Sequence, residues 1–131
     1  MKTLLRLLII SMTLLMVACG SKSLSISDFE EIGFTKSEEI VVVLPSNSLS
    51  GAWHGMLRGR MSMEVAIFDK AISKSDEELI NNVPSDKGYC QRVIHNAWFA
   101  ISYDDADDTT TNPPKETVDK ACDWVLESIS K

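Results

Sequence analysis

Two stretches in the last third of the chain carry apolar residues at steps of three and four, and this spacing constrains the fold more than any other feature. The first covers about residues 85–103 and the second about residues 113–130. Such spacing gathers apolar side chains on one face of a helix. Residues 104–111 between them are acidic and polar. Because two amphipathic helices joined by a short polar loop pack antiparallel, we expect a mainly α domain with a C-terminal antiparallel helical hairpin.

Further helices are expected upstream of this hairpin. Capping boxes predict helices that begin near Ser27 and Ser75, and Gly33 and Pro84 would end them. Apolar spacing predicts another helix in the second half of residues 52–72.

Residues 39–44 are the best candidate for a strand, because they contain three consecutive valines flanked by Ile40 and Leu44 and are followed by Pro45. A lone strand cannot satisfy its own backbone polar groups. This short β element would therefore pair with a weaker partner or be absorbed into a helical packing.

The first twenty residues have the layout of an export signal. Lys2 and Arg6 precede an apolar run over residues 7–17, broken by Ser11 and Thr13. The run is shorter than the ~20 apolar residues of a transmembrane helix.

The end of that run, Leu-Met-Val-Ala-Cys-Gly over residues 15–20, resembles the lipobox of bacterial lipoproteins, with Met16 where leucine is usual. The resemblance implies cleavage before Cys19, which would then carry a diacylglyceryl group and an amide-linked acyl chain. With Gly20 after the cysteine, it implies anchoring in the outer membrane, facing the periplasm. The alternative is an ordinary secretory signal cut after Ala18.

This layout divides the chain into a signal peptide (1–18), a lipidated, serine-rich tether (19–27) and one globular domain (28–131). Cleavage leaves 113 of the 131 residues and removes two cations, so the net charge changes from −6 to −8. Such acidity argues against nucleic-acid binding, which needs a basic face. It fits either a basic protein partner or simple solubility.

With Cys19 lipidated, Cys90 and Cys122 remain, and an exported protein with two cysteines favours one disulfide. Both lie on the apolar sides of the predicted helices. A modest stagger of the hairpin would bring their Cα atoms within the ~7 Å that a bridge needs. Two buried free thiols are the alternative.

The sequence carries no recognisable catalytic motif, so we expect a protein that is not an enzyme and needs no cofactor. His54 and His95 lack a second ligand at helical spacing, which argues against zinc. The loop 104–111 approximates a calcium loop but has Thr110 where the turn needs glycine. Trp53 and His54, in a glycine-flanked segment, are the candidate partner-binding residues, while Trp98 and Trp124 fit the core.

Residues 78–129 also resemble the Rap/Tai-type immunity proteins, exported helical proteins that block type VI secretion amidase toxins. The shared features are Leu79-Ile80, then Cys90 to Ile94 opening a helix, then Pro113 or Pro114 opening another. Val83 and Asn112 stand where that family's cysteines are expected. The resemblance implies a neutralising role. The hypothesis from the sequence is thus an envelope lipoprotein that binds a protein partner, with a structural subunit of an envelope assembly as the alternative.

Overall fold

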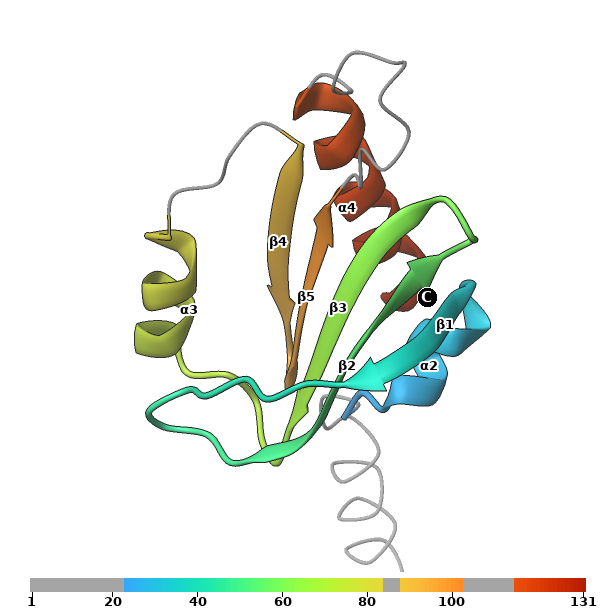
Figure 1. Cartoon of the computed structure of the whole chain (residues 1–131). Helices are drawn as coiled ribbons and strands as arrows, with labels where there is room; N and C mark the ends of the chain where they lie inside the picture. Colours follow the sequence, from blue (N-terminus) through green and yellow to red (C-terminus); the bar gives the residue numbers. More distant parts are fainter. Residues whose placement is uncertain (1–22, 84–87, 103–114) are drawn as a thin grey trace, which may run out of the picture.

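The structure, a computed structural model, describes residues 23–83, 88–102 and 115–131 and is built on one five-stranded antiparallel sheet with the order β1-β2-β3-β5-β4 (Figure 1). The strands are β1 (Phe34–Glu39), β2 (Leu49–Leu57), β3 (Met61–Phe68), β4 (Tyr89–Ile94) and β5 (Ala97–Ser102). The helices are α2 (Ile26–Glu31), α3 (Lys74–Asn81) and α4 (Lys115–Ile129). The expected mainly α class is wrong: the fold is α/β.

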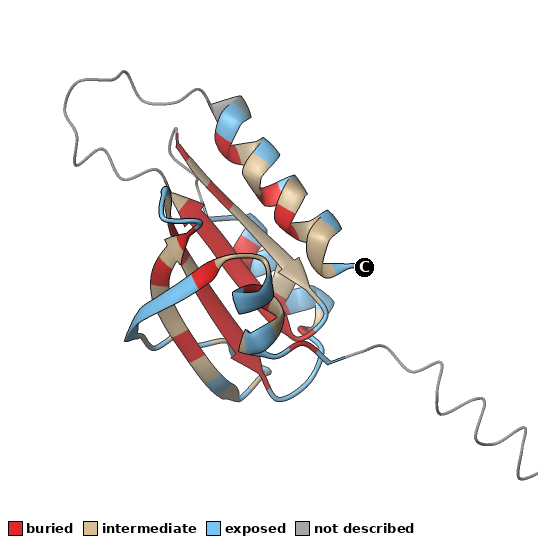
Figure 2. Ribbon diagram, turned by 90° about the vertical axis from the view of Figure 1, so that its right-hand side faces the viewer, coloured by how far each residue is buried: buried red, intermediate tan, exposed pale blue. Residues whose placement is uncertain are grey.

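One face of the sheet, here the α4 face, is covered by α2 and α4 and holds the larger core. Its buried side chains come from alternate strand positions and from both helices: Phe29, Phe34, Leu57, Met63, Val65, Ile67, Ala97, Phe99, Ile101, Val118, Cys122 and Val125. The rings of Phe29 and Phe99 meet edge to face with centroids 6.0 Å apart. Figure 2 shows that the buried residues concentrate on the central strands and the inner side of α4.

The opposite face, the α3 face, is covered in part by α3 and by the segment 40–48. Its buried residues are Ala52, Ala66, Phe68, Ile72, Ile80, Trp98 and Ala100. Half-buried Ile40, Val42 and Leu44 pack against them from the segment. Because α3 has only eight residues, part of this face is covered by the segment 40–48 and not by a helix.

The predicted helix over residues 85–103 is wrong, and with it the helical hairpin. Its described part forms β4 and β5, joined by a two-residue turn at His95 and Asn96, with His95 at φ +52°. Both faces of β5 are covered, so the strand reads as an unbroken apolar run and not as an alternation. Such a run matches helical spacing by accident, which explains the error.

The same reason accounts for the predicted helix in residues 52–72, which is the β2–β3 hairpin. The predicted strand at residues 39–44 is also wrong. β1 ends at Glu39, and residues 40–44 belong to no named strand, although Leu44 forms an isolated bridge with Asn47. Their burial alternates as in a strand, with Val41 and Val43 exposed and their neighbours half-buried.

Three helices were predicted at their observed places. The N-caps of α2 and α3 are Ser25 and Ser73, each two residues before the predicted cap, and the Ser73 hydroxyl accepts from the Asp76 N–H. α4 covers the described part of the predicted C-terminal helix.

The chain enters the fold through Leu24, which is buried and held by the β4–β5 turn. The Asn96 side chain accepts from Leu24 N–H at 2.7 Å and donates to Leu24 C=O at 3.0 Å and Phe68 C=O at 3.1 Å. The position of the last tether residues is therefore fixed against the sheet.

Several predictions fall outside the described residues: the signal peptide, lipidation at Cys19 and the calcium test of loop 104–111. Within the described ranges, no helix is long and apolar enough to cross a membrane.

Candidate functional site

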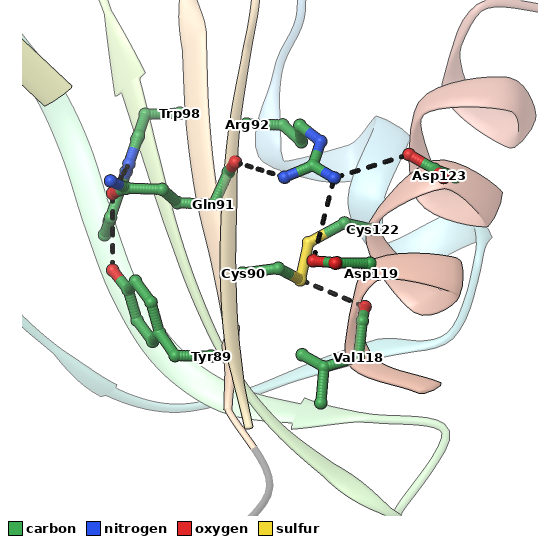
Figure 3. Close-up of a disulfide and its surroundings, with 9 residues drawn as sticks. All are labelled: Tyr89, Cys90, Gln91, Arg92, Trp98, Val118, Asp119, Cys122 and Asp123. Carbon is green, nitrogen blue, oxygen red and sulfur yellow. Dashed lines mark hydrogen bonds and ion pairs between the residues drawn. A yellow bond between two sulfur atoms is a disulfide. The ribbon is translucent and has the colours of Figure 1, made fainter. Parts of the chain in front are cut away.

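The predicted disulfide between Cys90 and Cys122 is present, but it joins a strand to a helix. Cys90 lies on β4 and Cys122 on α4, with their Cα atoms 6.4 Å apart. On the same face of β4, Arg92 pairs with Asp123 at 3.5 Å and with Asp119 at 4.0 Å. The bridge and these ion pairs hold α4 along β4 (Figure 3).

On the α3 face, beside β4, lies an apolar groove of about 360 Å³. It is bounded by the segment 42–45 on one side and by the end of α3 and Val83 on the other, and Trp98, Tyr89 and Gln91 of the sheet complete it. The apolar lining residues are Val42, Val43, Leu44, Pro45, Leu79, Ile80, Val83 and Trp98. We call this the α3 groove.

The rim of the α3 groove is unusually exposed for its composition. Val43, Leu79 and Val83 are 81%, 55% and 54% exposed, and Val41 beside the groove is 82% exposed. Single exposed apolar residues are ordinary, but a cluster of large ones around a concavity marks an interaction surface.

Buried Asp76 fixes one wall of the groove. Its carboxylate accepts from the Ser46 N–H at 3.1 Å, which ties the segment 42–45 to the start of α3. Asn47 adds a second attachment by donating to Lys70 C=O at 2.9 Å. The segment is therefore held in place without belonging to a strand of the sheet.

Gln91 connects the floor of the groove to α3. Its Nε2 donates to Ile80 C=O at 2.6 Å, and its Oε1 accepts from Trp98 Nε1 at 3.1 Å and from the Tyr89 hydroxyl at 3.3 Å. Figure 3 shows Tyr89, Gln91 and Trp98 on one side of β4, and Cys90 and Arg92 on the other. Burial, and secondly the charge of Glu64, raise the pKa of Tyr89 above its usual value.

A polar row continues from the groove across the α3 face. Strand pairing places four residues in one line across the sheet: His54, Glu64, Ala100 and Gln91. We call His54, Glu64 and Gln91 the polar row. His54 Nε2 is 3.4 Å from Ser62 Oγ, and its Nδ1 is 3.9 Å from Glu64 Oε1. Sequence spacing does not reveal this grouping, because it arises from strand register.

Ser62, His54 and Glu64 have the residue types of a nucleophile, a base and an orienting acid. An acyl-transfer site also needs free N–H donors for the oxyanion. Ser62 lies inside the sheet, with Ser102 of β5 opposite it. Because β3 has a strand on each side, its backbone donors are used in the ladders. The strand that carries Ser62 therefore offers no free N–H donor of the kind that such chemistry requires.

Trp53 and His54, the predicted partner-binding residues, lie on opposite faces of β2. The Trp53 ring packs against the α4-face core, and Lys36 Nζ lies 5.3 Å from its centroid. His54 lies on the α3 face in the polar row. Trp98 is buried in the α3-face core. Trp124 is half-buried, and the guanidinium carbon of Arg58 lies 4.2 Å from its ring centroid.

No cluster of three or more potential metal ligands occurs among residues 23–83, 88–102 and 115–131. Comparisons with family models, curated proteins and solved structures found no match to this chain. Sequence reasoning missed the α3 groove. The valine run at residues 41–43 gave no signal for it, because Val41 and Val43 are almost equally exposed and only Val43 lines the groove.

Proposed function

We propose that this chain is a lipid-anchored, non-enzymatic binding protein of the bacterial envelope and that it captures a protein partner at the α3 groove. The observation that carries the proposal is the cluster of Val43, Leu79 and Val83 around an apolar concavity. Burial of exposed apolar area of this kind drives association.

The composition of the groove supports a macromolecular partner over a small polar metabolite. Its open rim is apolar, and its polar groups at Gln91, Tyr89 and Trp98 bond to one another. The polar row beside the groove and the acidic net charge of the chain suit a partner with basic residues next to its apolar contact.

The anchor rests on the lipobox-like segment ending at Cys19. Attachment would hold the domain at a membrane surface, with Leu24 as the point where the chain enters the fold. Fractionation of cells that express Cys19→Ser tests this part: the protein is expected to leave the membrane fraction, and unchanged attachment would refute lipidation.

The groove itself is tested by a matched pair of substitutions. Val41 and Val43 are the same residue type with nearly equal exposure, but only Val43 lines the groove. In pull-downs from an envelope extract, Val43→Ser and Leu79→Ser are expected to lose a partner that the full chain and Val41→Ser retain. Equal recovery with all variants, or no partner at all, would refute binding at the groove.

A toxin-neutralising role remains a hypothesis from the sequence. The resemblance to the Rap/Tai-type immunity proteins implies that a helix begins at Cys90 to Ile94, but these residues form part of β4. The groove therefore carries the proposal, and the neutralising role would follow only if the captured partner proves to be a toxin.

A further inference from the structure

β4 is an edge strand of the sheet, and its pairing with β5 fixes which of its backbone N–H and C=O groups point outward. Phe68 N–H donates to Asn96 C=O, so the carbonyl of Asn96 is directed at β3. Successive residues of a strand direct their backbone N–H and C=O groups to opposite sides. The groups directed at β4 are therefore those of Ala97, Phe99 and Ile101. Their partners Ile94, Arg92 and Cys90 bond inward.

The backbone groups of Tyr89, Gln91 and Val93 therefore point away from the sheet. Of these groups, the Gln91 carbonyl accepts a bond from Arg92 Nη1 at 2.8 Å and keeps a second lone pair. Within the described part of the chain, no strand lies on this side of β4. A row of such groups is a template for another strand.

The other edge of the sheet is protected. Five of the six residues of β1 are exposed, and they include Lys36, Glu38 and Glu39. Its pairing with β2 also shifts register between Lys36 and Glu38. Charges and bulges are the usual means of blocking an edge, and β4 has one charged residue and a regular register.

The space beside β4 is a channel of about 300 Å³ lined from both sides. Asn81 and Val83 border it on the α3 side, next to the α3 groove, and Asp119 of α4 borders it on the other. On that second side, Arg92 faces two carboxylates, Asp119 and Asp123, so these three groups carry one net negative charge. The two walls therefore differ in chemistry.

We infer that β4 receives an added strand from a basic protein partner, an extended segment in which apolar residues alternate with lysine or arginine. Backbone bonds to Tyr89, Gln91 and Val93 supply the pairing. Side chains of a strand point alternately to its two faces, so the apolar ones meet Leu79 and Val83 and the basic ones meet Asp119 and Asp123. The inference rests on the proposed function and specifies how the partner is held.

The probe is the capped peptide Val-Lys-Val-Lys-Val-Lys-Val, titrated against the full chain in detergent by calorimetry. We expect binding that falls more than tenfold when glutamate replaces lysine. Two further peptides are N-methylated at either the lysines or the inner valines. Because only alternate amides of a strand face its neighbour, one of these should lose binding and the other retain it.

The matched variants are Val93→Pro and Val93→Thr. Proline removes an outward N–H without removing a β4–β5 bond, and proline is tolerated at edges. Threonine keeps that N–H. We expect Val93→Pro to weaken the lysine peptide more than tenfold and Val93→Thr to change it less than threefold, with similar thermal unfolding. Amide exchange on the unsubstituted chain is independent of these variants: peptide should slow exchange at Tyr89, Gln91 and Val93.

No binding of the lysine peptide, equal binding of both N-methylated peptides, or protection at β1 would overturn strand addition. So would a dimer of this chain that Val93→Pro dissociates, because a second copy would then occupy the edge. If an envelope partner is lost with Val43→Ser but kept with Val93→Pro, the groove function stands and the strand addition fails.

Discussion

The side-chain oxygen of Gln91 accepts the indole N–H of Trp98 at 3.1 Å, and this bond joins two neighbouring strands beneath the α3 groove. The same amide donates to Ile80 C=O, the last buried residue of α3. One side chain thus links the floor of the groove to its helical wall. The shape of the groove depends on a polar contact that an apolar residue cannot replace.

Replacing Gln91 with methionine should destabilise the fold and detach α3. The Trp98 indole would lose its partner, at about 1–3 kcal/mol for a buried group left unsatisfied. The Ile80 carbonyl would lose the bond from Gln91 and keep the one from Val83 N–H. Urea unfolding measures the loss. A double-mutant cycle with Trp98→Phe is the control, because that substitution removes the donor: additive costs would show that the two side chains are not coupled.

Tyr89 should titrate above the usual value of about 10. Burial, and secondly the charge of Glu64, raise its pKa. In a Tyr103→Phe background, the absorbance of tyrosinate reports Tyr89 alone. Glu64→Gln should lower the midpoint, which should still stay above that of the unfolded chain, since burial is the larger cause.

The raised pKa also links Tyr89 to stability. Its folded-state pKa lies above the unfolded value, so its contribution is complete below about pH 10 and is lost as pH rises through the folded pKa. Tyr89→Phe should abolish that part of the alkaline loss. A midpoint equal to that of the unfolded chain would contradict the burial of the hydroxyl.

The disulfide should contribute about 3–4 kcal/mol by closing a loop of 32 residues. Replacing both Cys90 and Cys122 with serine should lower the denaturation midpoint by a corresponding amount. In the Cys19→Ser chain, denatured without reductant, no reactive thiol is expected. Two reactive thiols would refute the bridge.

Asn96→Leu should loosen the entry of the chain into the fold. The substitution leaves Leu24 N–H and the carbonyls of Leu24 and Phe68 without their side-chain partner, again at about 1–3 kcal/mol per buried group. Limited proteolysis should cut near residue 24 faster than in the unsubstituted chain. His95→Ala, one residue earlier and exposed, is the control for the turn. Equal cleavage of all three proteins would contradict the role of Asn96.

The sequence by itself determined the features that depend on local chemistry. The helices α2, α3 and α4 carry caps or an amphipathic stripe, and these signals act within a few residues. The pairing of Cys90 with Cys122 followed from counting cysteines in a chain predicted to be exported. The export and lipid signals near Cys19 are likewise local, and they stay predictions, as does partner binding.

Only the tertiary structure decided that the predicted helices within residues 52–72 and 85–103 are instead strands, over residues 49–57, 61–68, 89–94 and 97–102. Their apolar residues follow no alternation because α2 and α4 cover one face of the sheet while α3 and segment 40–48 cover the other. Strand register then placed His54 beside Glu64, and Trp53 on the other face. The α3 groove and the free edge of β4 arise from contacts between elements far apart in the chain. Those contacts depend on which surfaces meet, and no local spacing encodes that.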